Sequence, residues 1–212
     1  MAPSGRVRLD TLMRWLQDAA QANVAALGFP DEIWVVRRTV LTVEQFPVYG
    51  EPVVVHTRPA GLARLWAQRE TTVEGEGGAR ARAVAVWVHL DASGRPRPLD
   101  TDYAAALAVY GEPTVKARLR HGPPANGAVE RPWAFRVADL DMADHVNNAV
   151  YWAVLEEDLR DWPADAPLVV EVEHPAAADV GPASVLVDGD MRWVVDGGGT
   201  VVASLRCTAS AP

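Results

Sequence analysis

The sequence predicts an α+β protein in which one architecture occurs twice in succession, each copy an antiparallel sheet wrapped around a long central helix. A helical pattern near the N-terminus is followed by four stretches rich in β-branched and aromatic residues. After a turn-rich connector, the order of strand, helix and further strands begins again. We therefore divide the chain into an N-terminal domain of residues 1–98, a connector of residues 99–130 and a C-terminal domain of residues 131–212. The halves share little sequence, so the repeat is one of architecture.

The first predicted helix begins at Asp10, whose carboxylate can accept a hydrogen bond from a free N–H group of the first turn. Gly28 and Pro30 predict its end near Leu27. Apolar residues recur between these ends at helical spacing: Leu9, Leu12, Met13, Leu16, Ala20, Val24 and Leu27. Because these residues form a single stripe, we expect the helix to lay one face on a sheet.

Four strands are predicted to follow, each bounded by glycine or proline. They are residues 33–46, 53–58, 62–73 and 79–90. In the connector, a short helix is predicted between Tyr103 and Tyr110. The second half is then expected to hold strands at residues 133–137, 168–173, 184–195 and 200–208, with a helix between the first two.

That second helix is predicted to run from Asn147 to about Leu159, and a polar loop carrying Asp141 and His145 precedes it. Asn147 and Asn148 are good capping residues, because a short side-chain oxygen can accept from the first free N–H groups of a helix. Those N–H groups and the positive end of the helix dipole favour negative charge. The sequence therefore places a carboxylate and an imidazole where developing negative charge would be stabilised.

The string Asp141-Met-Ala-Asp-His145-Val-Asn147-Asn148-Ala-Val-Tyr151 resembles the Asp-x-Asn-x-His-Val-Asn-Asn-x-x-Tyr signature of the acyl-acyl-carrier-protein (acyl-ACP) thioesterases. This family belongs to the 4-hydroxybenzoyl-CoA thioesterase-like superfamily and places two hot-dog domains on one chain. The segments Trp34-Val-Val-Arg-Arg38 and Pro47 to Val53 resemble its N-terminal domain more weakly. The resemblance implies a full strand before residues 3–7, so the first strand is expected to be short or missing here.

The resemblance implies an enzyme that hydrolyses an acyl-ACP or acyl-CoA thioester to a free acid and a thiol. Asp141 would activate water or attack the thioester directly, and the N–H groups of residues 145–147 would stabilise the oxyanion. His145, in its neutral form next to the helix dipole, would accept a proton or orient water. The second carboxylate of the family would be replaced by Asp179, with Glu173 as the next choice. Val146, Asn147, Asn148 and Tyr151 are the predicted substrate-binding residues.

One position departs from the signature, because Ala143 stands where the family has asparagine. Asp-x-Ala resembles the surroundings of the catalytic aspartate in the single-domain hydroxybenzoyl-CoA thioesterases, so Asp141 would work in their manner. The structural alternatives are that Asp141 and Asp179 form turns and that His145 and Asp144 cap the helix. The functional alternatives are a noncatalytic acyl- or carrier-binding protein and a hot-dog dehydratase or hydratase.

Composition narrows the function further. A net charge of −8 argues against nonspecific nucleic-acid binding, and an acidic carrier protein would need a local basic patch on this chain. Cys207 is the single cysteine, which excludes an internal disulfide and suits a cytoplasmic protein. No apolar run approaches the ~20 residues of a membrane span. The histidines lack the spacing of metal ligands, no cofactor is expected because water is the second substrate, and a homodimer is left open.

Overall fold

The computed structural model describes residues 1–28, 33–99 and 101–209. Within them, nine strands form one antiparallel sheet in the order β2-β3-β4-β1-β6-β9-β8-β7-β5. The strands are β1 (Ile33–Gln45), β2 (Val53–Leu62), β3 (Trp66–Gly75), β4 (Arg80–Leu90), β5 (Val129–Phe135), β6 (Leu168–Glu173), β7 (Gly181–Asp188), β8 (Met191–Asp196) and β9 (Val201–Ala209). The helices are α1 (Leu9–Ala26), α2 (Thr101–Leu107) and α3 (Ala153–Glu156), with short 3₁₀ turns η1 (Ala108–Tyr110), η2 (Val137–Asp139) and η3 (Val150–Trp152).

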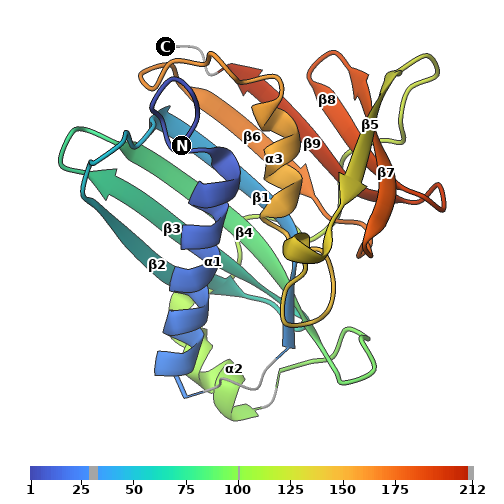
Figure 1. The fold of residues 1–212 in the computed structure, drawn as a ribbon. Coiled ribbons are helices and arrows are strands. Elements are labelled where there is room, and N and C mark those ends of the chain that lie inside the picture. The colour runs from blue at the N-terminus through green and yellow to red at the C-terminus, as the bar shows by residue number, and fades with distance from the viewer. Residues whose placement is uncertain (29–32, 100, 210–212) are drawn as a thin grey trace.

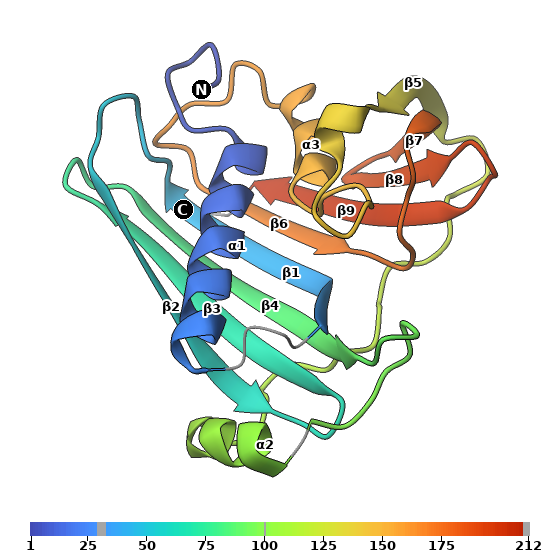
Figure 2. The ribbon, with the colours of Figure 1, turned by 60° about the horizontal axis from the view of Figure 1, so that its bottom comes forward.

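The two halves of the chain share this sheet. Strands β1–β4 come from the first half and β5–β9 from the second, and they join where β1 pairs with β6. Helices α1 and α3 lie on the same face of the sheet, as Figures 1 and 2 show. A large antiparallel sheet covered by few helices is the hot-dog-like arrangement that the sequence predicted. The division at residues 98 and 131 stays a prediction, because the sheet runs through both halves.

Two predicted elements were wrong. Residues 184–195, predicted as one strand, form the hairpin of β7 and β8, and its turn at Gly189 needs a positive φ of 52°. The long helix predicted from Asn147 to Leu159 is only η3 followed by α3, Val150–Glu156. Asn147 does not cap its start as predicted, because the N-cap position is Ala149, which makes no side-chain cap bond. Asn147 Oδ1 instead accepts from the N–H of Ala149 at 2.8 Å, in a turn that precedes the helix. The helix is short because its first residues are β-branched or aromatic, which disfavours long helices.

One continuous core fills the space between the sheet and the helices. On α1 the buried residues are Leu9, Leu12, Met13, Leu16 and Ala20, whereas the predicted Val24 and Leu27 are only half-buried. Gly28 ends α1 in the left-handed conformation at φ 86°, as predicted, and Pro30 lies outside the described residues. Nearly all of η3 and α3 is buried, so this short helical segment is surrounded by protein: Val150, Tyr151, Trp152, Val154 and Leu155. Within the described residues, no helix is both long and apolar enough to cross a membrane.

The start of α1 is held by the second half of the chain. Asp10, predicted as the cap, lies inside the first turn and pairs with Arg8 instead. The N–H of Leu9 donates to Glu156 Oε1 at 2.7 Å, so a carboxylate from α3 satisfies the helix start. The same carboxylate accepts two hydrogen bonds from the fully buried guanidinium of Arg6, at 3.1 and 3.0 Å. Before α1, Arg6 also forms an isolated bridge with Val48.

Replacing Glu156 by glutamine is expected to lower the free energy of unfolding by about 3–5 kcal/mol, because the buried charge of Arg6 loses its partner. The control is Glu44→Gln, since Glu44 pairs with Arg80 on the surface, where such a pair contributes less than about 1 kcal/mol. Urea unfolding of the three proteins measures both changes. Equal stability of the two variants would show that the Arg6–Glu156 pair does not hold the halves together.

Candidate active site

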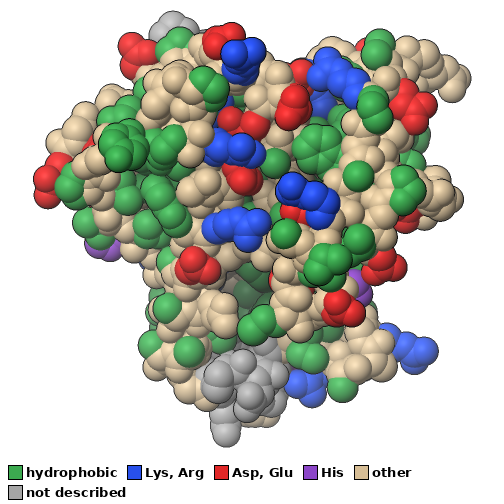
Figure 3. Space-filling view, in the orientation of Figure 1, with side chains coloured by type: hydrophobic (Ala, Val, Ile, Leu, Met, Phe, Trp, Pro, Cys, Tyr) green, Lys and Arg blue, Asp and Glu red, His purple; other side chains and the backbone are tan. Residues whose placement is uncertain are grey.

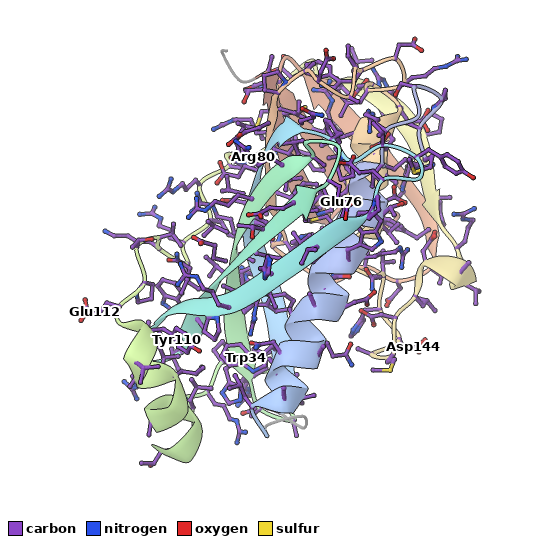
Figure 4. The ribbon with its side chains drawn as sticks, turned by 90° about the vertical axis from the view of Figure 1, so that its left-hand side faces the viewer. Trp34, Glu76, Arg80, Tyr110, Glu112 and Asp144 are labelled. Atoms are coloured by element: carbon purple, nitrogen blue, oxygen red, sulfur yellow. The ribbon has the colours of Figure 1, made fainter. Side chains whose placement is uncertain are left out.

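The loop that carries the Asp141–His145 motif is closed by its own backbone. Leu140 and Val146 form an isolated antiparallel bridge, and the N–H of Asp141 donates to the carbonyl of His145 at 2.9 Å. Asp144 sits at the tip with a φ of 59°, a conformation that aspartate tolerates better than most residues. In Figure 4 the tip, marked by Asp144, lies across α1 from Tyr110. The loop is therefore a small, well-defined unit beside α1.

Asp141 and His145 are both exposed at the surface of this loop. Asp141 Oδ1 accepts from the N–H of Ala143 at 2.9 Å, which is the turn-forming role that the sequence left as the alternative. That hydrogen bond uses one carboxylate oxygen and fixes the orientation of the group. If Asp141 acts as a base or nucleophile, its second oxygen, Oδ2, is the one free to react.

Two of the three predicted oxyanion donors are wrong. The N–H of Val146 donates to the carbonyl of Ala178 at 3.0 Å, and the N–H of Asn147 donates to the carbonyl of Asp139 at 2.8 Å. Sequence could not show the first of these bonds, because only the fold brings Ala178 to the motif, whereas Asp139 stands just before Asp141 in the chain. Within the described part of the chain, the N–H groups of His145 and Asn148 meet no acceptor. Asn148 is the more protected of the two, since it is half-buried.

Asn148 also lines a cavity between α1 and the sheet. The cavity measures about 40 Å³, and its walls come from both halves of the chain. The surface is hollowed beside α1 in Figure 3, with apolar side chains on its floor. Polar groups reach the cavity from Gln17, Thr39, Arg69, Thr71, Asn148 and His174. Of the predicted site residues, Asn148 is the one that reaches this space.

His174 is the cavity residue that the sequence reasoning missed. It follows the last residue of β6, is 5% exposed, and its Nδ1 has no hydrogen-bond partner within the described residues. Alternation along a strand was the available signal, because buried Val170 and Val172 face the core and place His174 on the same side. The predicted Glu173 accordingly lies on the opposite face.

Arg37 holds the chain around His174. A β-bulge between Val36 and Arg38 leaves Arg37 as an extra residue in β1, and such bulges redirect side chains. Its guanidinium donates to the carbonyls of His174 at 2.8 Å and Pro175 at 3.0 Å, while the N–H of His174 donates to the carbonyl of Arg37 at 3.0 Å. Burial, together with the positive charge of Arg37, lowers the pKa of His174 from 6.5 to about 3. The imidazole is therefore neutral at physiological pH.

Tyr151 and Asp179 lie around the same region in different ways. Tyr151 is buried, and its ring makes edge contacts with those of Phe135, at 5.4 Å between centroids, and His174, at 5.2 Å. Burial raises the pKa of Tyr151, and the charge of Asp141 adds to this rise. Asp179 is exposed, but it follows Ala178, whose carbonyl accepts from Val146. The fold thus brings the loop of Asp179 to the motif loop.

Glu173 belongs to a separate buried cluster on the other face of the sheet. Its oxygens accept from the N–H groups of Arg120, at 2.7 Å, and His121, at 3.0 Å, so it fastens the connector to β6. Ligand atoms of His121, Glu171 and Glu173 lie within 4.8 Å of one another and could hold a metal ion. Arg38 already supplies positive charge there, since it pairs with Glu171 and lies 3.9 Å from Glu173. The spacing of the histidines in sequence could not reveal this cluster.

Both halves of the chain match domains of one known protein family. Residues 2–106 match the acyl-ACP thioesterase N-terminal domain, and residues 124–175 match the acyl-ACP thioesterase C-terminal domain. An uncharacterized protein of Mycobacterium tuberculosis is 27% identical over 177 residues, which cover 80% of this chain and 70% of that protein.

Solved structures share the fold at low sequence identity. An acyl-ACP thioesterase from Bacteroides thetaiotaomicron superposes with a TM-score of 0.80 at 19% identity, covering 99% of this chain and 93% of its own. A putative oleoyl thioesterase from Lactobacillus plantarum gives 0.77 at 20%, covering 100% and 92%. The 12:0-ACP thioesterase from Umbellularia californica gives 0.76 at 21%, covering 98% and 91%. The arrangement of strands and helices is therefore common to all four chains.

The pKa of His174 predicts how stability depends on pH. The unfolded chain takes up a proton at this residue below pH 6.5, whereas the folded protein resists protonation until about pH 3. The free energy of unfolding should therefore fall as the pH drops from 6.5 towards 3, by up to about 1.4 kcal/mol per pH unit from this group. In His174→Phe, the decline measured by urea unfolding between pH 7 and 5 should be smaller. Parallel declines would contradict the assignment.

Cys207 is expected to be chemically inert. Burial raises the pKa of its thiol to about 11, and the charges of Asp158 and Asp190 add to the rise against that of Arg192. Because the thiolate is the reactive form, a disulfide reagent at pH 8 should label the folded protein at least about 100-fold more slowly than the unfolded protein. Equally fast labelling of both would show that the thiol is reactive in the folded protein and would make Cys207 a candidate nucleophile.

Proposed function

The chain belongs to the acyl-ACP thioesterase family, and from this membership we propose that it hydrolyses an acyl thioester carried by acyl-carrier protein or CoA. The observation that carries the proposal is the cavity beside α1, which the Asn148–Trp152 segment of the family motif walls on one side. A thioesterase needs an apolar space for the acyl group that ends beside hydrogen-bond donors. Here α1 and the sheet supply most of the space, and the motif supplies a donor at Asn148.

The acyl group would lie between α1 and the sheet. The cavity at its present size holds only a few water molecules, so an acyl chain needs the side chains of α1 to move. Met13 and Gln17 line the cavity and are long and flexible, and methionine adapts well to irregular spaces. The chain length accepted would then depend on how far these side chains can be displaced.

In the proposed reaction, the free carboxylate oxygen of Asp141 removes a proton from water as the water oxygen bonds to the thioester carbon. The electron pair of the C=O π bond moves to oxygen, where the N–H of Asn148 stabilises it. The C–S bond then breaks, the carbonyl reforms, and the leaving thiolate takes the proton from Asp141. His145 and Asp179, on the two adjoining loops, would orient the water. Val146, Asn147 and Tyr151, the other predicted substrate-binding residues, do not line the cavity and would support the segment that carries Asn148.

The carrier is either acyl-carrier protein or CoA. On the face shown in Figure 3, a groove of about 600 Å³ runs between the start of α1, β5 and α3 and is lined by Arg8, Arg14 and Arg136. Two of these arginines are paired with carboxylates, Arg8 with Asp10 and Arg136 with Asp139. Arg14 and Glu157, which also line the groove, form no ion pair within the described residues and carry opposite charges, so the groove favours neither carrier strongly.

A noncatalytic acyl-binding protein is the second candidate. It is favoured by Ala143, which stands in place of the motif asparagine, and by the exposure of Asp141. Such a protein would use the cavity without turning over the thioester. The two functions differ in one measurement, the release of free thiol.

Asp141→Asn should lower kcat for thiol release by about 100-fold or more, the usual contribution of a general base. The assay follows free thiol across a panel of acyl lengths on both CoA and acyl-carrier protein. The matched control is Asp144→Asn on the same loop, since asparagine tolerates the positive φ there and should retain activity. Equal kcat in Asp141→Asn and the wild type would remove Asp141 from the mechanism. Acyl-CoA binding by the wild type without any thiol release would establish the noncatalytic candidate.

A further inference from the structure

We propose that His174 is a further catalytic residue, whose neutral imidazole donates a hydrogen bond to the carbonyl oxygen of the thioester. The inference rests on the proposed function, because it assigns a group to the same reaction. It adds to that function a residue that lies outside the Asp141–Tyr151 motif. His174 reaches the cavity from the end of β6, next to the wall that the motif provides.

The position of His174 suits contact with the reacting group. Its ring lines the cavity together with Asn148, Ala149 and Trp152. Asn148 offers a backbone N–H without an acceptor in the described structure, so two donors can converge on one oxygen. Removing one donor of such a pair costs on the order of 100- to 1,000-fold in kcat in known enzymes.

The hydrogen bonding of the ring points the same way. Nδ1 of His174 is buried and meets no partner among the described residues, although an unpaired buried polar atom is destabilising and rare in folded proteins. The neighbouring ring of Tyr151 packs against the imidazole through an edge contact at 5.2 Å between centroids. No described residue supplies the imidazole with a hydrogen-bond partner, so a substrate carbonyl in the cavity can take that place, whereas a packing role alone would be met better by an apolar ring.

The charge state of the ring fits a donor rather than a base. Enclosure by the core and the nearby guanidinium of Arg37 keep the imidazole neutral, so it carries one N–H and takes up no second proton at physiological pH. A neutral imidazole can polarise a carbonyl while both of its nitrogens retain their protonation state. The backbone on both sides of His174 is held by Arg37, which keeps the donor in place without solvent.

The experiment compares the wild type with His174→Phe, His174→Asn and His174→Gln in the thiol-release assay. Phenylalanine keeps an aromatic ring but no donor, whereas the amides of asparagine and glutamine approximate the two imidazole nitrogens. We expect kcat of His174→Phe to fall about 100- to 1,000-fold with little change in KM. We also expect one amide variant to retain at least about ten times the kcat of His174→Phe. His56→Phe is the matched control, since His56 is exposed on β2 and should leave activity unchanged.

A second measurement does not depend on turnover. A CoA thioether with a 2-oxoalkyl group keeps a carbonyl but cannot be hydrolysed, and its binding should shift the imidazole ¹⁵N resonances of His174 and leave those of His56 in place. An unmoved His174 resonance, or kcat of His174→Phe within threefold of the wild type, would overturn the inference and leave the proposed function standing. Equal losses in all three His174 variants would also overturn it, because they would indicate a purely structural role. Absence of thiol release by the wild type would instead overturn the proposed function, and the inference with it.

Discussion

The pairing of β1 with β6 is the contact on which the rest of this structure depends. Residues Arg38–Val43 run antiparallel to Leu168–Glu173 and turn two groups of strands into one sheet. Since side chains alternate across a strand, this junction has two different faces. One face carries Arg38, Glu171 and Glu173 and receives the connector, while the other carries buried Leu41, Val170 and Val172. The charged cluster and the cavity of the candidate site are therefore kept apart by a single layer of backbone.

The two helical segments on the inner face perform different tasks. Helix α1 is long, buries its N-terminal half, and forms one wall of the cavity along its side. The segment η3–α3 is short and almost entirely buried, so only the residues at its start contribute to the candidate site. The carboxylate of Glu156 links the two, since it satisfies the first N–H of α1 and the guanidinium of Arg6 together. Asn148 directly precedes this enclosed segment, so buried residues follow it in the chain.

Local patterns accounted for the parts of the fold that neighbouring residues decide. The strands of the first half, the end of α1 at Gly28 and the turn at Asn147 follow from alternation, conformational preference and short-range hydrogen bonding. The β7–β8 hairpin was missed because apolar residues continue on both sides of its turn at Gly189. The length of the second helix was overestimated because its spacing is helical even where its residues are poor helix formers.

By itself, the sequence determined the family, through the ordered string from Asp141 to Tyr151. It also determined the order of strands and helices along the chain, apart from the β7–β8 hairpin and the length of the second helix. The tertiary structure alone decided which of those residues meet. Glu156 caps a helix that lies 147 residues away, Ala178 occupies the N–H of Val146, and the bulge at Arg37 fixes the backbone of His174. The reason is physical: spacing in sequence describes neighbours within one helix or strand, whereas donors, acceptors and cavity walls are assembled from segments that become neighbours only when the sheet closes.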